Sequence, residues 1–154
     1  MFICSVRAST LRFVGLIGLA LALFVGGVIY ARGDALPASS IRYTKVKTDG
    51  DRLEFLSQFG WETTGETLET EEFVIPKTFD RVMLGYNEIQ KNQGLDLSRY
   101  ENKKVTRYTY EVTNYEGYEG TVYANVLVWR KKVIGGDVCS AEITNGFVQG
   151  FEKK

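Results

Sequence analysis

The pattern of apolar and polar positions begins with an unbroken apolar run. Residues 13–31 (FVGLIGLALALFVGGVIYA) carry no charge, and Arg7 and Arg12 precede them without any acid. A helix of this length spans about 28 Å, close to the roughly 30 Å hydrocarbon core of a bilayer. The pattern predicts a single-pass transmembrane signal-anchor helix over residues 13–31, behind a basic N-terminal segment over residues 1–12.

A secretory signal peptide also starts with basic residues and an apolar run. This run exceeds the roughly 7–15 residues usual for such a peptide, and Ile29 stands where a small residue should precede a cut after Ala31. We therefore expect a retained anchor, with cleavage as the alternative. Gly18, Ala22 and Gly26 recur every four residues, a spacing that lets membrane helices pack closely and predicts a weak homodimer.

The orientation of this anchor depends on basic residues at its two ends. Arg7 and Arg12 favour an N-terminus inside the cell, whereas a second basic group after the run favours the reverse: Arg32, Arg42, Lys45 and Lys47. An acid-free basic start followed by an apolar run is typical of export signals. We expect the C-terminal domain outside the cell membrane, with a cytoplasm-facing regulatory module as the alternative.

Periodicity beyond residue 31 predicts a polar tether over residues 32–50 and one α+β domain over residues 51–154. Apolar residues at helical spacing predict helices over 52–59 and from Phe79 to the residue before Gly94. Alternation predicts strands over 105–115, 121–129 and 133–140, and a short strand near 146–151. Residues 61–64 and 71–75 predict two further short strands around a turn at Gly65. The expected fold has its helices on one face of an antiparallel sheet, in the order α-β-β-α-β-β-β.

Several strings in this domain resemble the uncharacterised bacterial "domain of unknown function 4830" family. They are FLSQFGWE, FVIP, YNEIQKNQGLDLSRY, KVTRYTYEVTNY, VYANVLVW and VIGGDVCS, spread over roughly residues 52–151. One local departure is the charged turn at residues 130–132, where a glycine-containing turn is expected. The resemblance implies an envelope-associated protein of Gram-positive bacteria, and it carries no known activity, cofactor or catalytic residue.

Composition excludes several functions. The chain has no histidine, which removes Ser-His-Asp triads, Cys-His pairs and imidazole metal ligands. Its 19 basic and 19 acidic residues balance, so the charge excess of a nucleic-acid binder is missing. Two cysteines cannot form a disulfide-rich scaffold or a four-thiolate zinc site. We expect neither a metal nor a cofactor, and no nucleic-acid partner.

Two local motifs are more easily explained by structure than by chemistry. Five glutamates between Glu62 and Glu72 lack the spacing of a calcium loop, and we expect a solvated acidic hairpin there. Gly135 and Gly136 interrupt a strand, which predicts a bulge or a close approach of another segment to the backbone. For Cys139, which follows them, we expect a buried, unreactive thiol.

Aromatic and polar residues of the second helix and the strands provide the candidate binding site. Flat rings beside carboxylates and amides suit recognition of a glycan or a peptide. The candidate residues are Tyr86, Asn87, Gln90, Tyr108, Tyr123, Asn125 and Asp137. We expect a non-catalytic binding or interaction module, with another envelope protein or a cell-wall component as its partner. The alternative is a small enzyme that uses the Cys139 thiol or pairs Asp137 with Glu111 or Glu142.

Overall fold

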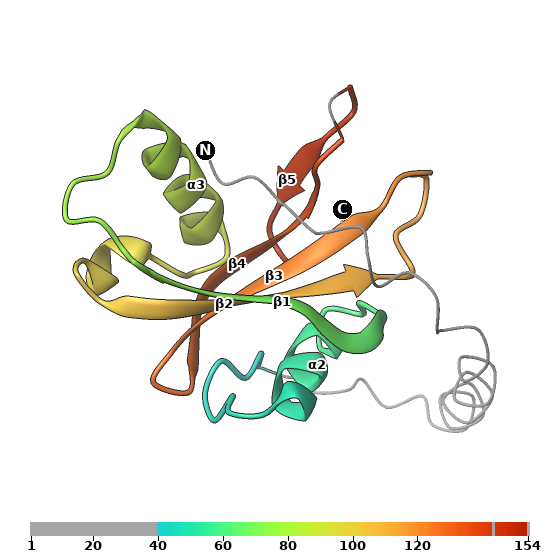
Figure 1. Cartoon of the computed structure of the whole chain (residues 1–154), viewed down its shortest axis with the longest axis horizontal. Coiled ribbons are helices and arrows are strands. Elements are labelled where there is room, and N and C mark those ends of the chain that lie inside the picture. The colour runs from blue at the N-terminus through green and yellow to red at the C-terminus, as the bar shows by residue number, and fades with distance from the viewer. Residues whose placement is uncertain (1–39, 143, 154) are drawn as a thin grey trace. The chain divides into compact units, whose positions relative to one another are not determined.

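Five antiparallel strands form a sheet in which each strand pairs with the next one along the chain (Figure 1). The computed structural model describes residues 40–142 and 144–153. The strands are β1 (Thr63–Val74), β2 (Lys104–Val112), β3 (Val122–Trp129), β4 (Lys132–Ser140) and β5 (Phe147–Gln149). β3 is the central strand, which explains why both of its faces carry apolar residues.

Capping side chains fix where the two α-helices begin. Helix α2 (Asp49–Ser57) starts with a capping box in which Thr48 and Asp51 bond to each other's backbone. Helix α3 (Arg81–Asn92) starts at Asp80, whose carboxylate accepts from the Met83 amide at 2.8 Å. Gly94, at φ 75°, follows the end of α3, and a short 3₁₀ helix, η2 (Leu97–Tyr100), comes next.

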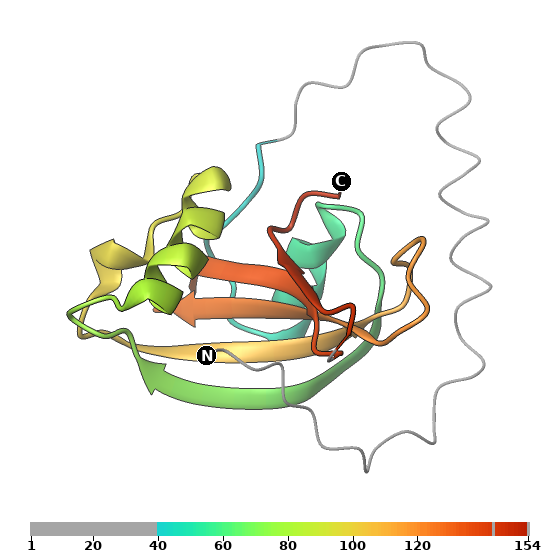
Figure 2. The same cartoon turned by 90° about the horizontal axis from the view of Figure 1, so that it is seen from above.

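The two helices lie on opposite faces of the sheet (Figures 1 and 2). Arg52 of α2 donates from Nε to the Tyr110 hydroxyl at 2.7 Å, whereas Tyr86 of α3 donates to Asp137 at 2.6 Å. Thr109 is next to Tyr110 on β2. It pairs with Asn125 of β3, which pairs in turn with Asp137 of β4. Because successive strand residues point to opposite faces, α2 and α3 cover different sides.

Each face has its own apolar core. On the α3 side one cluster unites α3, η2 and the sheet: Ile75, Met83, Leu97, Val105, Leu127 and Ile134. On the α2 side the ring of Phe55 packs edge-on against that of Phe151, with 5.0 Å between centroids. Both rings are fully buried. The middle of the sheet is therefore covered on both sides.

The expected fold class is wrong in its details. One strand, β1, replaces the two expected short strands, because Gly65 at φ 84° lies at an irregularity in the pairing with β2 and not at a turn. The helices do not share a face of the sheet. The antiparallel order of the later strands agrees with expectation.

The membrane part of that fold class also needs correction. No helix within residues 40–142 and 144–153 is long and apolar enough to cross a membrane. The expected span at residues 13–31, with its Gly18, Ala22 and Gly26 face, lies outside the described residues. The end of the expected tether belongs to the fold, since the Tyr43 carbonyl accepts from the Val133 amide at 2.8 Å.

Candidate functional site

The close contact of α3 and η2 with β4 depends on Gly135, whereas the neighbouring Gly136 lies against β3 and Phe151. A Cβ atom on Gly135 would lie 2.9 Å from Leu97 Cδ2, and one on Gly136 would collide with the Asn125 carbonyl oxygen. Gly135 and Val133 pair with consecutive residues of β3, and Ile134 between them forms a bulge. Gln90 closes the contact by accepting from the Gly136 amide at 2.8 Å. The bulge and the close approach expected at these glycines are confirmed.

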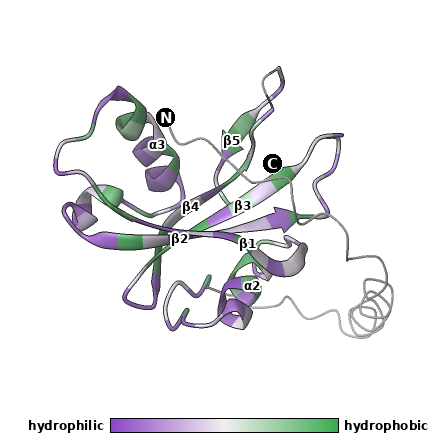
Figure 3. Cartoon of the chain, in the orientation of Figure 1, coloured by the Kyte–Doolittle hydropathy of each residue, from purple (hydrophilic) through white to green (hydrophobic). Residues whose placement is uncertain are grey.

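A pocket of about 200 Å³ opens beside this contact. It lies between α3, the strands β2 to β4 and the edge strand β5. Its aliphatic wall is made by Val82, Ile89, Leu127 and Val148, and its remaining lining by Tyr86, Arg107, Asn125, Asp137 and Cys139. Val82 and Val148 are about half exposed, at 51% and 49%. In Figure 3, α3 accordingly carries hydrophobic and hydrophilic residues side by side.

Asp137 is a buried carboxylate, only 5% exposed, held by two donors. The Tyr86 hydroxyl donates to Oδ2 at 2.6 Å, and Asn125 Nδ2 donates to Oδ1 at 2.9 Å. Asn125 is oriented in turn by the Thr109 hydroxyl, which donates to its Oδ1 at 2.7 Å. Burial raises the pKa of Asp137 despite these bonds, and burial beside the carboxylate raises the pKa of Tyr86 well above its usual value. Charge on Asp137 is therefore disfavoured by its burial.

Arg107 brings a second buried charge to the same pocket. Its side chain is about nine-tenths buried, and Nη2 lies 2.6 Å from Glu71 and 3.7 Å from Glu69. Its Nε has no hydrogen-bond partner among the described residues. Within the described part of the chain, no nitrogen-to-oxygen contact of 4.0 Å or less joins Arg107 to Asp137. A cationic donor and a carboxylate therefore line one pocket without pairing to each other.

The acidic run is mostly exposed, as expected, but it lies along the single strand β1 and not in a hairpin. Glu71 and Glu69 approach Arg107, and Glu72 forms an ion pair of 2.5 Å with Lys104 on the neighbouring strand. Part of the acidic run is thus the counter-charge of a basic strand.

Three of the residues expected at the site line the pocket: Tyr86, Asn125 and Asp137. Two others are buried next to it and hold the backbone. Asn87 accepts from the Leu97 amide at 2.8 Å, and Gln90 bonds to β4 as described. Their roles are those of loop and bulge supports.

The last two expected residues lie elsewhere. Tyr108 is on the α2 face of the sheet, where the Arg52 guanidinium stacks 3.6 Å above its ring. Tyr123 pairs with Cys139 across β3 and β4, is half-buried and does not line the pocket. The alternation of β2 already separated Tyr108 from Arg107, because adjacent residues of a strand point to opposite faces.

Sequence reasoning missed Arg107 and the aliphatic wall. One signal for Arg107 was available in the sequence. Its strand is next to a strand that is apolar on both faces, so a charged residue there is expected to be buried and to need a partner. The helical spacing of apolar residues places Val82 and Ile89 on one face with Met83. Only Met83 of these three is buried.

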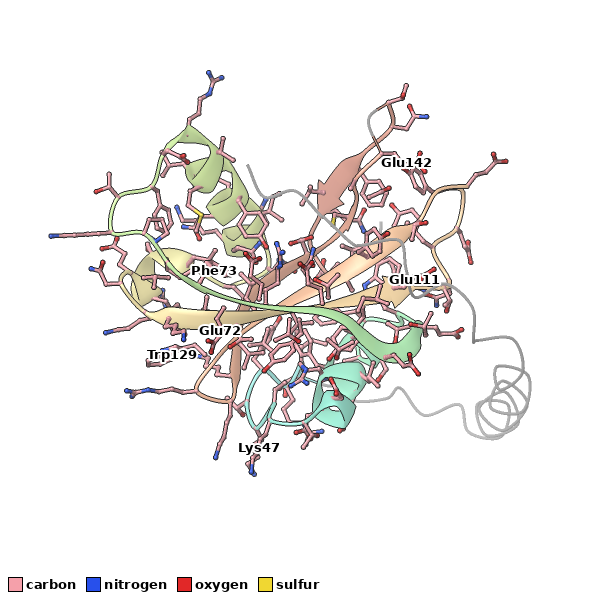
Figure 4. The ribbon with its side chains drawn as sticks, viewed as in Figure 1. Lys47, Glu72, Phe73, Glu111, Trp129 and Glu142 are labelled. Carbon is pink, nitrogen blue, oxygen red and sulfur yellow. The ribbon has the colours of Figure 1, made fainter. Side chains whose placement is uncertain are left out.

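The structure does not assemble the residues of the enzyme alternative. Glu142 lines a different pocket with the loop residues from Tyr115 to Gly120, and Glu111 does not line the pocket of Asp137. Figure 4 shows Glu111 and Glu142 towards one end of the sheet and Phe73 and Trp129 towards the other. None of the described cysteines is free, which corrects the expected free thiol and removes Cys139 as a nucleophile. No group of side chains among the described residues is arranged to hold a metal ion.

A family model described as "Domain of unknown function (DUF4830)" matches residues 55–138, more than half of the chain. The chain belongs to the DUF4830 family. The matched residues run from α2 to β4 and include Tyr86, Arg107, Asn125 and Asp137. No curated protein and no solved structure matches the chain. The family therefore names no activity, and function has to be argued from the pocket.

Proposed function

We propose that this DUF4830 member is a non-catalytic binding module that holds a small molecule, or an exposed group of a partner, in the pocket between α3 and β5. One observation carries the proposal. Arg107 and Asp137 line this pocket, both nearly buried, and no ion pair of 4.0 Å or less joins these two described residues. An unsatisfied buried donor costs roughly 1–3 kcal/mol, and a ligand that reaches both groups would recover that loss.

The surroundings of the two charges also support binding. Tyr86 and Asn125 hold the Asp137 carboxylate in one position, and Glu71 holds the far end of Arg107. Groups fixed in this way lose little conformational entropy when a ligand arrives. Val82 and Val148 add exposed aliphatic surface at the same place.

A matched pair of variants tests the pocket. Val82 and Leu84 are both on α3 and are 51% and 52% exposed, but only Val82 lines the pocket. The full-length chain in mild detergent is titrated with 3-methylbutanol, 4-methylpentanoate, 4-methylpentanamide, N-acetylglucosamine and leucinamide. Backbone amide shifts of residues 135–139 report binding.

We expect at least one probe to shift these amides in the wild type and in Leu84→Trp, and to lose at least tenfold in affinity in Val82→Trp. The indole should fill the mouth of the pocket. The proposal fails if no probe shifts these residues, or if Val82→Trp and Leu84→Trp bind equally well.

We further propose that the domain acts outside the cell membrane, on another envelope protein or a cell-wall component. This proposal rests on the sequence of residues 1–31 alone. Protease added to intact cells should then remove the C-terminal domain. Protection until the cells are opened would favour the cytoplasm-facing alternative and contradict the proposal.

A further inference from the structure

The chemistry of the pocket narrows the class of ligand. We infer that it binds an aliphatic α-amino group followed by a carbonyl or carboxylate, as found in an aliphatic amino acid or in the first residue of a peptide. This inference rests on the proposed function, because it names what the same pocket holds.

Asp137 is the acceptor for the amino group. An ionised carboxylate has about four acceptor sites, and Tyr86 and Asn125 occupy two of them. An ammonium group brings three donors and a positive charge, whereas a hydroxyl brings one donor and no charge. The ammonium therefore offsets the burial of the carboxylate best.

Arg107 is the donor for the neighbouring oxygen. Because Nη2 is already engaged by Glu71, the unpartnered Nε offers one hydrogen bond. One bond suits the single oxygen of a peptide carbonyl, and it also serves one oxygen of a free carboxylate. Arg107 and Asp137 line the same pocket, so a ligand with an adjacent amine and carbonyl can contact both residues.

The local charge balance argues against a simple anion. Arg107 carries one positive charge against the carboxylates of Glu71 and Asp137, with Glu69 3.7 Å from Nη2. A bound carboxylate that has no amine would add a further negative charge to this cluster of charged side chains. A ligand that carries an ammonium group balances it.

Size and lining select an aliphatic side chain. The pocket of about 200 Å³ is smaller than the roughly 300–1,000 Å³ of pockets for drug-sized ligands, so it suits a molecule the size of one amino acid. The rest of the lining includes four aliphatic side chains: Val82, Ile89, Leu127 and Val148. A branched side chain such as that of leucine matches it.

Calorimetric titration of the full-length chain in mild detergent tests the inference with paired probes. Leucinamide and 4-methylpentanamide differ only by the amino group. We expect leucinamide to bind at least tenfold more tightly, and N-acetylleucine, whose amine is blocked, to lose a similar factor. Equal affinities for leucinamide and 4-methylpentanamide would overturn the inference.

Variants provide the second arm. Arg107→Met and Asp137→Asn should each weaken leucinamide binding at least tenfold, whereas Arg99→Met, which changes an exposed arginine outside the pocket, should not. Unchanged binding in both pocket variants would also overturn the inference. The paired probes act on the wild type, so the result does not depend on how the variants fold.

The same titrations distinguish the possible sources of the ligand. They also show whether only the ligand class is wrong or the proposed pocket as well. Tight binding of leucine alone identifies free amino acids, and matching affinities for leucinamide and Leu-Ala identify peptide N-termini. If 4-methylpentanamide or 3-methylbutanol binds as well as leucinamide, and Val82→Trp blocks it, the ligand class is wrong and the proposed pocket stands. If no probe binds, both fail.

Discussion

Replacing Arg107 by methionine should change the free energy of unfolding by less than about 1 kcal/mol, although the side chain is only 9% exposed. Breaking a well-made buried ion pair usually costs roughly 3–5 kcal/mol. The expectation is smaller here because the guanidinium is poorly satisfied and its partners are exposed.

The magnitude follows from three contributions. Glu71 is half exposed, so its ion pair with Arg107 contributes about 0–1 kcal/mol after solvent screening. Removing the unpartnered Nε recovers roughly 1–3 kcal/mol of desolvation. Losing the attraction between Arg107 and ionised Asp137 offsets part of this gain. Methionine keeps the aliphatic packing of the stem.

Arg52 is the matched comparison, because it is a second buried arginine, 5% exposed, with its donors engaged. It donates to the buried Tyr110 hydroxyl at 2.7 Å and stacks on Tyr108 at 3.6 Å. A charged hydrogen bond contributes about 1.5–3 kcal/mol and a cation–π contact about 1 kcal/mol. Arg52→Met should therefore lose about 3 kcal/mol.

Urea denaturation of both variants at pH 7, followed by circular dichroism, measures the two changes. A loss of 3 kcal/mol or more for Arg107→Met, equal to that of Arg52→Met, would refute the reasoning. Arg107 would then be a structural ion-pair residue and not a group held ready for a ligand.

Three further changes test the structure. Burial raises the pKa of Asp137 above 3.8, so its contribution to the free energy of unfolding falls as pH rises from 3.8 through the folded-state pKa. Over that pH interval Asp137→Asn should gain stability relative to the wild type. Above the interval the difference between the two should stay constant. A pH-independent difference between their unfolding curves would contradict this. Lys131→Gly should raise stability by about 1 kcal/mol in thermal melts, because Lys131 has a φ of 65°, and a lower melting temperature would count against it. Gly136→Ala should lose more than about 2 kcal/mol in urea through its clash with Asn125, while Gly85→Ala, with no described atom within 4 Å of its Cβ, should not.

Much of the fold was predictable from local signals. Period-two alternation located β2 to β4, and helical spacing of apolar residues located both helices to within a few residues. The continuity of β1 was not predictable, because Gly65 has the sequence character of a turn and takes a positive φ inside a strand. The placement of the helices on opposite faces depends on tertiary packing, which the periodicity of a single helix does not encode.

The orientation of α3 shows why the site was only partly predictable. Its apolar stripe predicted a core face through Val82 and Ile89, but the structure buries Met83 with the polar Asn87 and Gln90. The two polar residues satisfy backbone amides of η2 and of the bulged β4. The apolar stripe is displaced, and part of it becomes the wall of the pocket.

The central claim is that Arg107 Nε meets a ligand oxygen in the pocket beside Asp137. The side-chain Nε–H resonance of Arg107, recorded by ¹H–¹⁵N NMR on the full-length chain, tests it most directly. On saturation with leucinamide, the account predicts a downfield shift of this proton and slower exchange with solvent, both lost in Val82→Trp. An Arg107 resonance that stays unchanged at saturating leucinamide would contradict the account.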